Sequence, residues 1–295
     1  MKKTILVTGA TGNIGMLVIP KLIGAGATVH AFVRNAEKAK PLEDAGAKIF
    51  VGDFEDPKAL DNAMIGVDTV FSITPPNPRS VEQASETMNA AKRAENPPAF
   101  VRLSVVNAAL DAPTENARLH GVTEKELKES GLRFTILQPH FFMQNIWGSV
   151  QTIAEQGKMY WGMGNGKLGM IDVRDIVDAS VEVLLNRSFG NKTWKITGPV
   201  AITFHEAASA IALAIGKPVN YIPVDLETVR NGMKQLGFDE WFADVMAQYS
   251  KAYSEGWGDF TTGDFAELTG KPARNISQFA TEVLATSFMK AATAV

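Results

Sequence analysis

Along the first half of the chain, short apolar runs alternate with longer stretches that mix apolar and charged residues. The mixed stretches are long enough for helices. Strands that alternate with helices in this way form βαβ units. The pattern predicts a Rossmann-type, doubly wound parallel sheet with helices on both faces, in the α/β class. The predicted strands are the runs at 4–9, 28–34, 48–53, 69–74, 100–106 and 133–139.

The alternation loosens after Pro139. An aromatic, glycine-punctuated segment leads to a helix-like stretch at 177–186, and residues 194–224 indicate a strand, a helix and a strand. That helix is expected to begin with a capping box at Thr203–Glu206 and to end at Gly216. We therefore expect residues 1–140, rejoined by about 168–190, to form a nucleotide-binding domain. Residues 141–295 are expected mainly to form a smaller α+β lobe.

Composition narrows the classes of partner. The 295 residues are 45% hydrophobic and 21% charged, with a formal net charge of -3, so there is no basic excess to attract nucleic acid or anionic membranes. With no cysteine, the chain has no disulfide and no thiolate nucleophile, which fits the cytoplasm. No run reaches the roughly 18 apolar residues of a membrane span. A small-molecule partner is expected, and a homodimer stays open.

A glycine-rich turn joins the first predicted strand to the first helix. It reads GATGNIG from Gly9 to Gly15. Glycines permit a tight turn and let backbone N–H groups approach a pyrophosphate, whose charge suits a helix N-terminus. The strand before the turn and the helix after it agree with a dinucleotide site. The residues predicted to hold the cofactor here are Gly9, Thr11, Gly12, Asn13, Ile14 and Gly15.

The end of the second strand carries Arg34 rather than an acidic residue, and Lys38 follows one helical turn later. An arginine there accommodates a 2′-phosphate, whereas an acidic residue bonds a free 2′-hydroxyl. We therefore expect NADP(H), with NAD(H) the weaker ligand. The alternative is a solvated surface arginine.

Two further strand ends complete the predicted nucleotide site, because ligands lie at the carboxyl ends of parallel strands. Asp53 can accept from the adenine amino group, and Phe54 can line the ring. Ile73, Thr74 and Pro75 are expected to pass beside the adenosine-side ribose and the nicotinamide end.

The segments VTGATGNIG, FVRN, VGDFEDP and TGPVAITFHEAASAIALAIGKPVNYIPV make the chain resemble the NmrA-like, atypical branch of the short-chain dehydrogenase/reductase family. The similarity runs over most of the chain. It implies an NADP(H)-binding Rossmann domain and a smaller C-terminal lobe that closes over a substrate cleft. Members include quinone and dye reductases, biosynthetic reductases and NADP-binding sensors.

The proton-donating couple of ordinary short-chain dehydrogenases, Tyr-x-x-x-Lys, is missing, since none of the four tyrosines has a lysine four residues later. Ser104 matches the serine of that scheme, His120 stands near the tyrosine position, and Glu124 stands at the lysine position. A carboxylate-oriented histidine of near-neutral pKa could protonate a reduced substrate. A metal site lacks an evident third ligand, so no metal is expected. The remaining alternative is an exposed helix face.

The segment after the sixth strand is the expected substrate pocket. An aromatic wall with a polar handle would suit a flat ligand, whereas core packing of the lobe is the alternative. His140 is a second proton-donor candidate, and His30 and His205 are expected to be structural. The predicted pocket residues are His140, Phe141, Phe142, Met143, Gln144, Asn145 and Trp147.

Two functions fit these features. A quinone or a conjugated cation spreads the incoming charge and needs little acid help, so the missing couple favours an NADPH-dependent reductase of such acceptors. The alternative is an NADP(H)-binding redox sensor that acts through a regulatory protein partner without turnover. Epimerase and alcohol dehydrogenase chemistry are disfavoured, because they need the couple.

Overall fold

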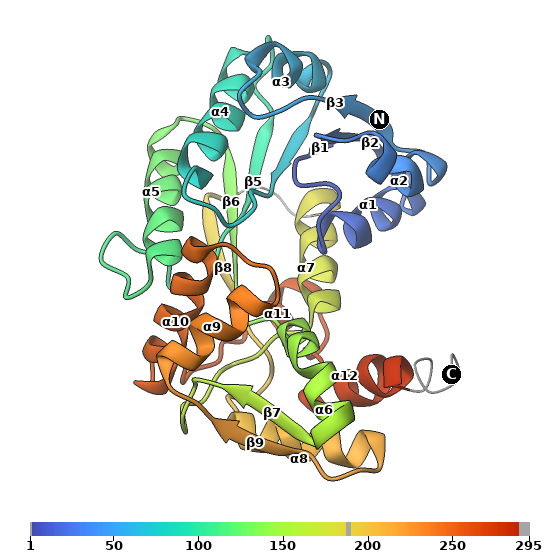
Figure 1. The fold of residues 1–295 in the computed structure, drawn as a ribbon. Helices are drawn as coiled ribbons and strands as arrows, with labels where there is room; N and C mark the ends of the chain where they lie inside the picture. The colour runs from blue at the N-terminus through green and yellow to red at the C-terminus, as the bar shows by residue number, and fades with distance from the viewer. Residues whose placement is uncertain (1, 187–189, 289–295) are drawn as a thin grey trace. The chain divides into compact units, whose positions relative to one another are not determined.

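The structure is a computed structural model that describes residues 2–186 and 190–288. Within these residues the main sheet has seven strands in the order β3-β2-β1-β4-β5-β6-β8 (Figure 1). All six strands predicted before Pro139 are confirmed, and they pair in parallel. The strands are β1 Thr4–Val7, β2 Thr28–Val33, β3 Lys48–Val51, β4 Thr69–Ser72, β5 Ala99–Leu103, β6 Phe134–Pro139 and β8 Lys192–Ile196.

The seventh strand, β8, joins the main sheet beside β6. At its start, the Asn191 side chain accepts a hydrogen bond from the N–H of Phe134, at 3.1 Å. At its end, the carbonyl of Ile196 accepts from the N–H of His140, at 2.9 Å. Because both ends match the ends of β6, β8 runs parallel to β6.

Helices cover both faces of this sheet, as predicted. Figure 1 shows α1, α2 and α7 on one side and α3, α4 and α5 on the other. Strands β4, β5 and β6 are buried along their whole length, as expected for a parallel sheet covered on both faces. The helices are α1 Gly15–Gly24, η1 Glu37–Ala39, α2 Lys40–Asp44, α3 Pro57–Met64, α4 Ser80–Arg93, α5 Glu115–Glu129 and α7 Val173–Leu185.

The chain divides into two compact units. Unit 1 comprises Met1–Ala112, Asn116–Pro139 and Ile176–Lys195, and unit 2 comprises Pro113–Glu115, His140–Asp175 and Ile196–Val295. The assignment of nucleotide binding to one domain and substrate binding to the other stays a prediction.

Unit 2 contains a two-stranded parallel sheet of β7 Lys158–Trp161 and β9 Asn220–Pro223. Its core is aromatic, with Phe204 and Tyr253 among the buried side chains. The predicted capping box forms at Thr203–Glu206, and Gly216 ends the helix in the left-handed conformation. The helices are η2 Met143–Ser149, α6 Val150–Gln156, α8 Phe204–Ile215, α9 Leu226–Gln235, α10 Glu240–Ser254, α11 Asp264–Thr269, α12 Ile276–Phe279 and η3 Ala280–Leu284.

Membrane insertion through a helix finds no support in the described residues. None of their helices combines the length and the apolar character that crossing a bilayer requires.

Candidate functional site

The glycine loop between β1 and α1 is held tightly against the end of β4. The Thr8 hydroxyl donates to the carbonyl of Ile73 and accepts from its N–H, each at 2.9 Å. A Cβ at Gly9, where φ is +59°, would lie 2.8 Å from the Ile73 carbonyl oxygen. A Cβ at Gly15 would lie 2.3 Å from the carbonyl oxygen of Ala10. Both positions therefore require glycine, because real Cβ atoms do not approach backbone oxygens so closely.

This loop ends in an uncapped helix N-terminus. Helix α1 begins at Gly15, and Ile14 before it supplies no side-chain cap. Among the described residues, the backbone N–H groups of Asn13, Ile14 and Gly15 have no acceptor. Thr11, Gly12 and Asn13 are exposed. The loop therefore offers unpaired donors at the positive end of a helix, with Asn13 exposed and Ile14 and Gly15 buried, and a pyrophosphate prefers such a helix end.

Two cations stand near the end of β2. Arg34 is the first residue after the strand and is exposed, with no ion-pair partner among the described residues. Lys38 is also exposed, and the Asn35 side chain holds its segment by accepting from the N–H groups of Glu37 and Lys38, at 2.8 and 3.4 Å. Both charges are available to an anionic ligand.

The residues after β3 and β4 differ in how open they are. Asp53 is exposed and accepts from the N–H of Glu55 at 3.1 Å, which leaves its second carboxylate oxygen available. Phe54 is 7% exposed and packs edge-on against Phe32 with ring centroids 6.0 Å apart, so its ring is largely used in the core. It also lines a hollow of about 280 Å³.

The segment after β4 splits between the loop and the interior. Ile73 is half-buried and packs against Gly9, whereas Pro75 is exposed. The Thr74 hydroxyl accepts from Arg102 at 2.9 Å. The side chain of Thr74 is therefore engaged inside unit 1, and its backbone remains the part that a ligand can contact.

A buried carboxylate, Glu124, organises the polar residues at the ends of β5 and β6. Its Oε1 accepts from the Ser104 hydroxyl at 2.6 Å and from the Gln138 amide at 2.7 Å. Its Oε2 accepts from Lys128 at 3.1 Å. Glu124 is only 2% exposed, so the alternative of an exposed helix face is wrong for this residue. The carboxylate holds Ser104 rather than His120.

His120 is also buried, at 8% exposure, but its neighbour is Arg102. Its Nδ1 lies 3.5 Å from Nη2 of Arg102. Burial first, and then the Arg102 charge, lower the pKa of His120 well below its ordinary value. His120 is therefore neutral at pH 7. This corrects two expectations, a near-neutral pKa and orientation by Glu124.

The buried polar cluster around Glu124 and His120 has two further members, Arg102 and Gln138, which were not predicted from the sequence. Arg102 lies within β5 and is 2% exposed, and burial lowers its pKa to about 10. Residues two apart in a strand share a face, so Arg102 and Ser104 point the same way. A charged residue inside the otherwise apolar run FVRLSVV was the available signal.

His140 belongs to unit 2 and is 1% exposed. Its Nδ1 accepts from the N–H of Phe141 at 2.7 Å, and its Nε2 donates to the carbonyl of Gly258 at 3.1 Å. The ring also contacts Phe260 and Tyr253. Burial lowers the pKa of His140 to about 4. Since both nitrogens are used, His140 does not serve as the second proton donor that the sequence suggested.

This buried neutral histidine predicts acid sensitivity. The folded pKa of His140 lies below the ordinary value of 6.5, so the unfolded chain binds the proton more strongly. Stability is therefore full above about pH 6.5 and falls as pH drops towards 4. We expect His140 to contribute a loss of about 2 kcal/mol between pH 7 and pH 5. Urea unfolding at the two pH values measures it.

Matched variants isolate that contribution, because burial lowers the pKa of His30 and of His120 as well. The pH-dependent loss should shrink in His140→Gln and stay unchanged in His205→Gln, whose ring is exposed. Equal losses in wild type and His140→Gln would contradict the assignment.

The predicted pocket residues separate into buried and accessible groups. Phe141 is 7% exposed and packs against Trp161 and Phe204 in the core of unit 2, and Met143 is 1% exposed. The Gln144 amide donates to Asp172 and accepts from the N–H of Val173, each at 2.9 Å, so it is no free polar handle. Phe142 is half-buried, whereas Asn145 is exposed and Trp147 is 49% exposed.

The two histidines expected to be structural are placed accordingly. His30 is buried in β2, with Nδ1 2.9 Å from the carbonyl of Ala63. His205 lies in the first turn of α8, between the two capping-box residues. All four tyrosines of the chain, Tyr160, Tyr221, Tyr249 and Tyr253, belong to unit 2.

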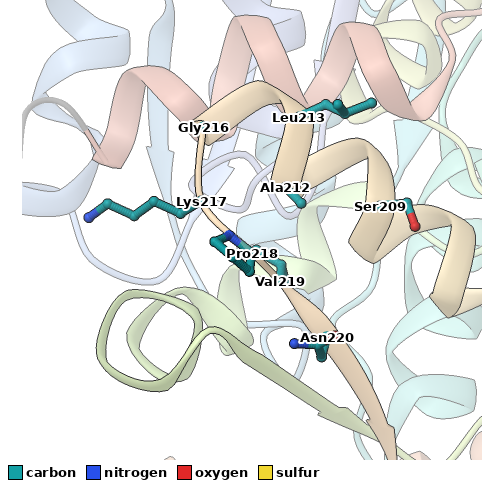
Figure 2. Close-up of a pocket in the computed structure, with 8 residues that line it drawn as sticks. All are labelled: Ser209, Ala212, Leu213, Gly216, Lys217, Pro218, Val219 and Asn220. Carbon is teal, nitrogen blue, oxygen red and sulfur yellow. The ribbon is translucent and has the colours of Figure 1, made fainter.

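A hollow of about 610 Å³ lies at the C-terminal end of α8 and the start of β9 (Figure 2). Among the described lining residues Lys217 is the only charged one, Ser209 and Asn220 are polar, and Leu213 is 86% exposed. None of the residues predicted to bind a cofactor or a substrate lines it.

Comparison with known proteins agrees with this geometry. An NAD(P)H azoreductase from Xenophilus azovorans is 37% identical, covering 94% of this chain and 96% of that protein. The structure of an NADPH-dependent quinone oxidoreductase from Escherichia coli in complex with NADPH matches with a TM-score of 0.86 and 26% identity, covering 95% and 99% of the chains. A Citrobacter triphenylmethane reductase complexed with NADP(H) matches with a TM-score of 0.84 and 26% identity, covering 96% and 99%.

The family model described as the NmrA-like family matches residues 1–256. The resemblance inferred from the glycine loop and the C-terminal segment is confirmed. The chain therefore belongs to the NmrA-like family.

Proposed function

We propose that this protein is an NADPH-dependent reductase that delivers a hydride to a conjugated small-molecule acceptor, such as a quinone or an azo or triphenylmethane dye. The observation that carries the proposal is the glycine loop at the start of α1, where three N–H groups lack an acceptor among the described residues, together with the exposed Arg34 directly after β2. The reductases named above, which cover nearly the whole chain, support it.

Each part of the nucleotide has a proposed holder. The loop from Gly9 to Gly15 binds the pyrophosphate through backbone N–H groups, and Arg34 with Lys38 neutralises the 2′-phosphate. Asp53 accepts from the adenine amino group, and the Ile73–Pro75 backbone lies beside the ribose and nicotinamide end. The bound reduced nicotinamide supplies the hydride.

The acceptor is proposed to be conjugated because unit 1 supplies no strong acid. Unit 1 contains no tyrosine, the Ser104 hydroxyl is already donated to Glu124, and His120 is neutral. A conjugated acceptor spreads the incoming negative charge and tolerates weak acid assistance. We propose that residues 141–295 mainly form the substrate lobe, where the exposed Asn145 and Trp147 contact the acceptor.

The test is NADPH oxidation by purified protein with a naphthoquinone, a neutral azo dye, a cationic triphenylmethane dye and cyclohexanone. Loss of the NADPH absorbance band should depend on the conjugated acceptors. The rate with the best of them should exceed the rate with cyclohexanone by at least about a hundredfold. Tight NADPH binding without turnover of any compound would contradict the proposal and favour the sensor.

Arg34→Ala should reduce the preference for NADPH over NADH by about tenfold to a hundredfold, the value of one charge-assisted arginine–phosphate contact. Titration of both cofactors, followed by fluorescence, gives the ratio of dissociation constants. Arg133→Ala is the matched control. Arg133 is also exposed, but it precedes β6 and so lies where the parallel strands begin, whereas Arg34 lies where they end. Equal affinity of the wild type for both cofactors would remove the assignment.

A further inference from the structure

The guanidinium of Arg102 is buried in unit 1 among neutral partners. Nη1 donates to the Ser72 hydroxyl at 3.3 Å, and Nη2 donates to the Thr74 hydroxyl at 2.9 Å. Nη2 also lies 3.5 Å from Nδ1 of His120. Glu124 and Glu126 act on this charge only through space, without an ion pair to Arg102 among the described residues. The histidine ring is therefore a direct neighbour of a buried cation that forms no ion pair among the described residues.

Hydrogen-bond chemistry then fixes the tautomer of His120. A guanidinium has donors only, so the His120 nitrogen that faces it must be the acceptor. In a neutral imidazole the other nitrogen carries the hydrogen. Nδ1 is therefore unprotonated and Nε2 carries the N–H. A doubly protonated ring would place an N–H against an N–H beside a second buried charge.

The Nε2–H of His120 is available to a ligand. Nε2 bonds to no described residue, and it is not among the polar atoms sealed from solvent. The charge that acts on the ring is that of Arg102 from β5, and Glu124 lies one turn along the same helix as His120. Glu124 is already occupied by Ser104, Gln138 and Lys128. No described acceptor competes for the Nε2 hydrogen.

We propose that Arg102 is a positioning residue that holds His120 as the neutral Nε2–H tautomer, so that His120 acts as a hydrogen-bond donor to the acceptor rather than as an imidazolium acid. The role of His120 as a donor to the acceptor rests on the proposed reductase function. As hydride adds to a neutral quinone or azo acceptor, negative charge develops on its oxygen or nitrogen and is stabilised by the Nε2–H. That hydrogen stays on His120, and water supplies the one proton that completes the two-electron reduction. A cationic triphenylmethane dye becomes neutral when hydride adds to its central carbon, so its reduction takes up no proton.

The test measures which ring nitrogen of each histidine carries a hydrogen. The chain has four histidines, so a long-range ¹H–¹⁵N spectrum of the uniformly labelled full-length protein contains four ring patterns, assigned with single His→Gln variants. His120 should give the Nε2–H pattern, unchanged from about pH 8 to pH 5. His30 is an internal contrast: its Nδ1 faces a carbonyl at 2.9 Å, so it should give the Nδ1–H pattern. An Nδ1–H or doubly protonated His120 would overturn the proposal.

Arg102→Met removes the charge and the donor while keeping the length of the side chain. The His120 pattern should become a mixture of tautomers, and its titration midpoint should rise. Lys128→Met is the control, because it removes a cation that contacts Glu124 instead of His120. An unchanged His120 pattern in folded Arg102→Met would also overturn the proposal. If that variant does not fold, the wild-type spectrum alone decides.

Kinetic measurements test the donor role of His120 separately from its tautomer. His120→Ala should lower kcat/KM for the best quinone or azo acceptor by about tenfold to a hundredfold, whereas His120→Gln, whose amide can donate, should recover part of the loss. Arg102→Met should add an acid-side inflection to the pH profile that wild type lacks. Full activity of His120→Ala would overturn the donor role. Absence of turnover with every acceptor would refute the proposed function and leave the tautomer result standing.

Discussion

Gly15→Ala is expected to lower the affinity for NADPH by at least about a hundredfold. The new Cβ would lie 2.3 Å from the Ala10 oxygen and 2.6 Å from the Gly9 oxygen, so the backbone of the loop must move. It cannot move freely, because Thr8 and Gly9 hold it against Ile73. The displaced N–H groups lose two or more charge-assisted bonds of about 1.5–3 kcal/mol each. A fluorescence titration with NADPH measures the loss.

Gly24→Ala is the matched control, since Gly24 ends the same helix and a Cβ there meets nothing within 4 Å. That variant should bind NADPH as wild type does and should be at least as stable. Circular dichroism establishes that Gly15→Ala is folded. A folded Gly15→Ala protein with a dissociation constant within twofold of wild type would refute the assignment of the loop to the pyrophosphate.

Glu124→Ala is expected to cost about 3 kcal/mol of folding free energy. The side chain is 2% exposed, and its removal leaves the Ser104 hydroxyl and the Gln138 amide without their shared acceptor. Each buried donor that loses its partner costs about 1–3 kcal/mol. The melting temperature should fall by roughly 5–10 °C. Glu124→Gln keeps an acceptor oxygen and should cost less.

Glu129→Ala controls for the loss of one carboxylate from α5, because Glu129 is exposed at the end of that helix. Its melting temperature should stay close to that of wild type. A Glu124→Ala variant as stable as Glu129→Ala would mean that water replaces the carboxylate, and Glu124 would then have no structural role.

The elements that the sequence predicted well are those encoded by neighbouring residues. The six strands before Pro139, the loop from Gly9 to Gly15 and the capping box at Thr203 each follow from a short local pattern. The sequence did not show which sheet β8 joins, because its partner β6 lies more than fifty residues earlier.

The polar cluster shows the same limit at the level of side chains. The spacing from Ser104 singled out His120 and Glu124, but four-residue spacing did not decide which groups they bind. Buried donors from β5 and β6 set the partners: Arg102 contacts His120, and Gln138 donates to Glu124. Such tertiary contacts lie outside any pattern along α5, so the expected histidine–carboxylate couple does not form.

The two hydrogen bonds between Thr8 and Ile73 affect the entropy of anion binding at the glycine loop. These bonds anchor the start of the glycine loop to Ile73 before any ligand arrives. An anion that binds there does not have to order a mobile segment, so little conformational entropy is lost on association. If the loop binds the pyrophosphate as proposed, its anchored start lowers the entropic cost of association.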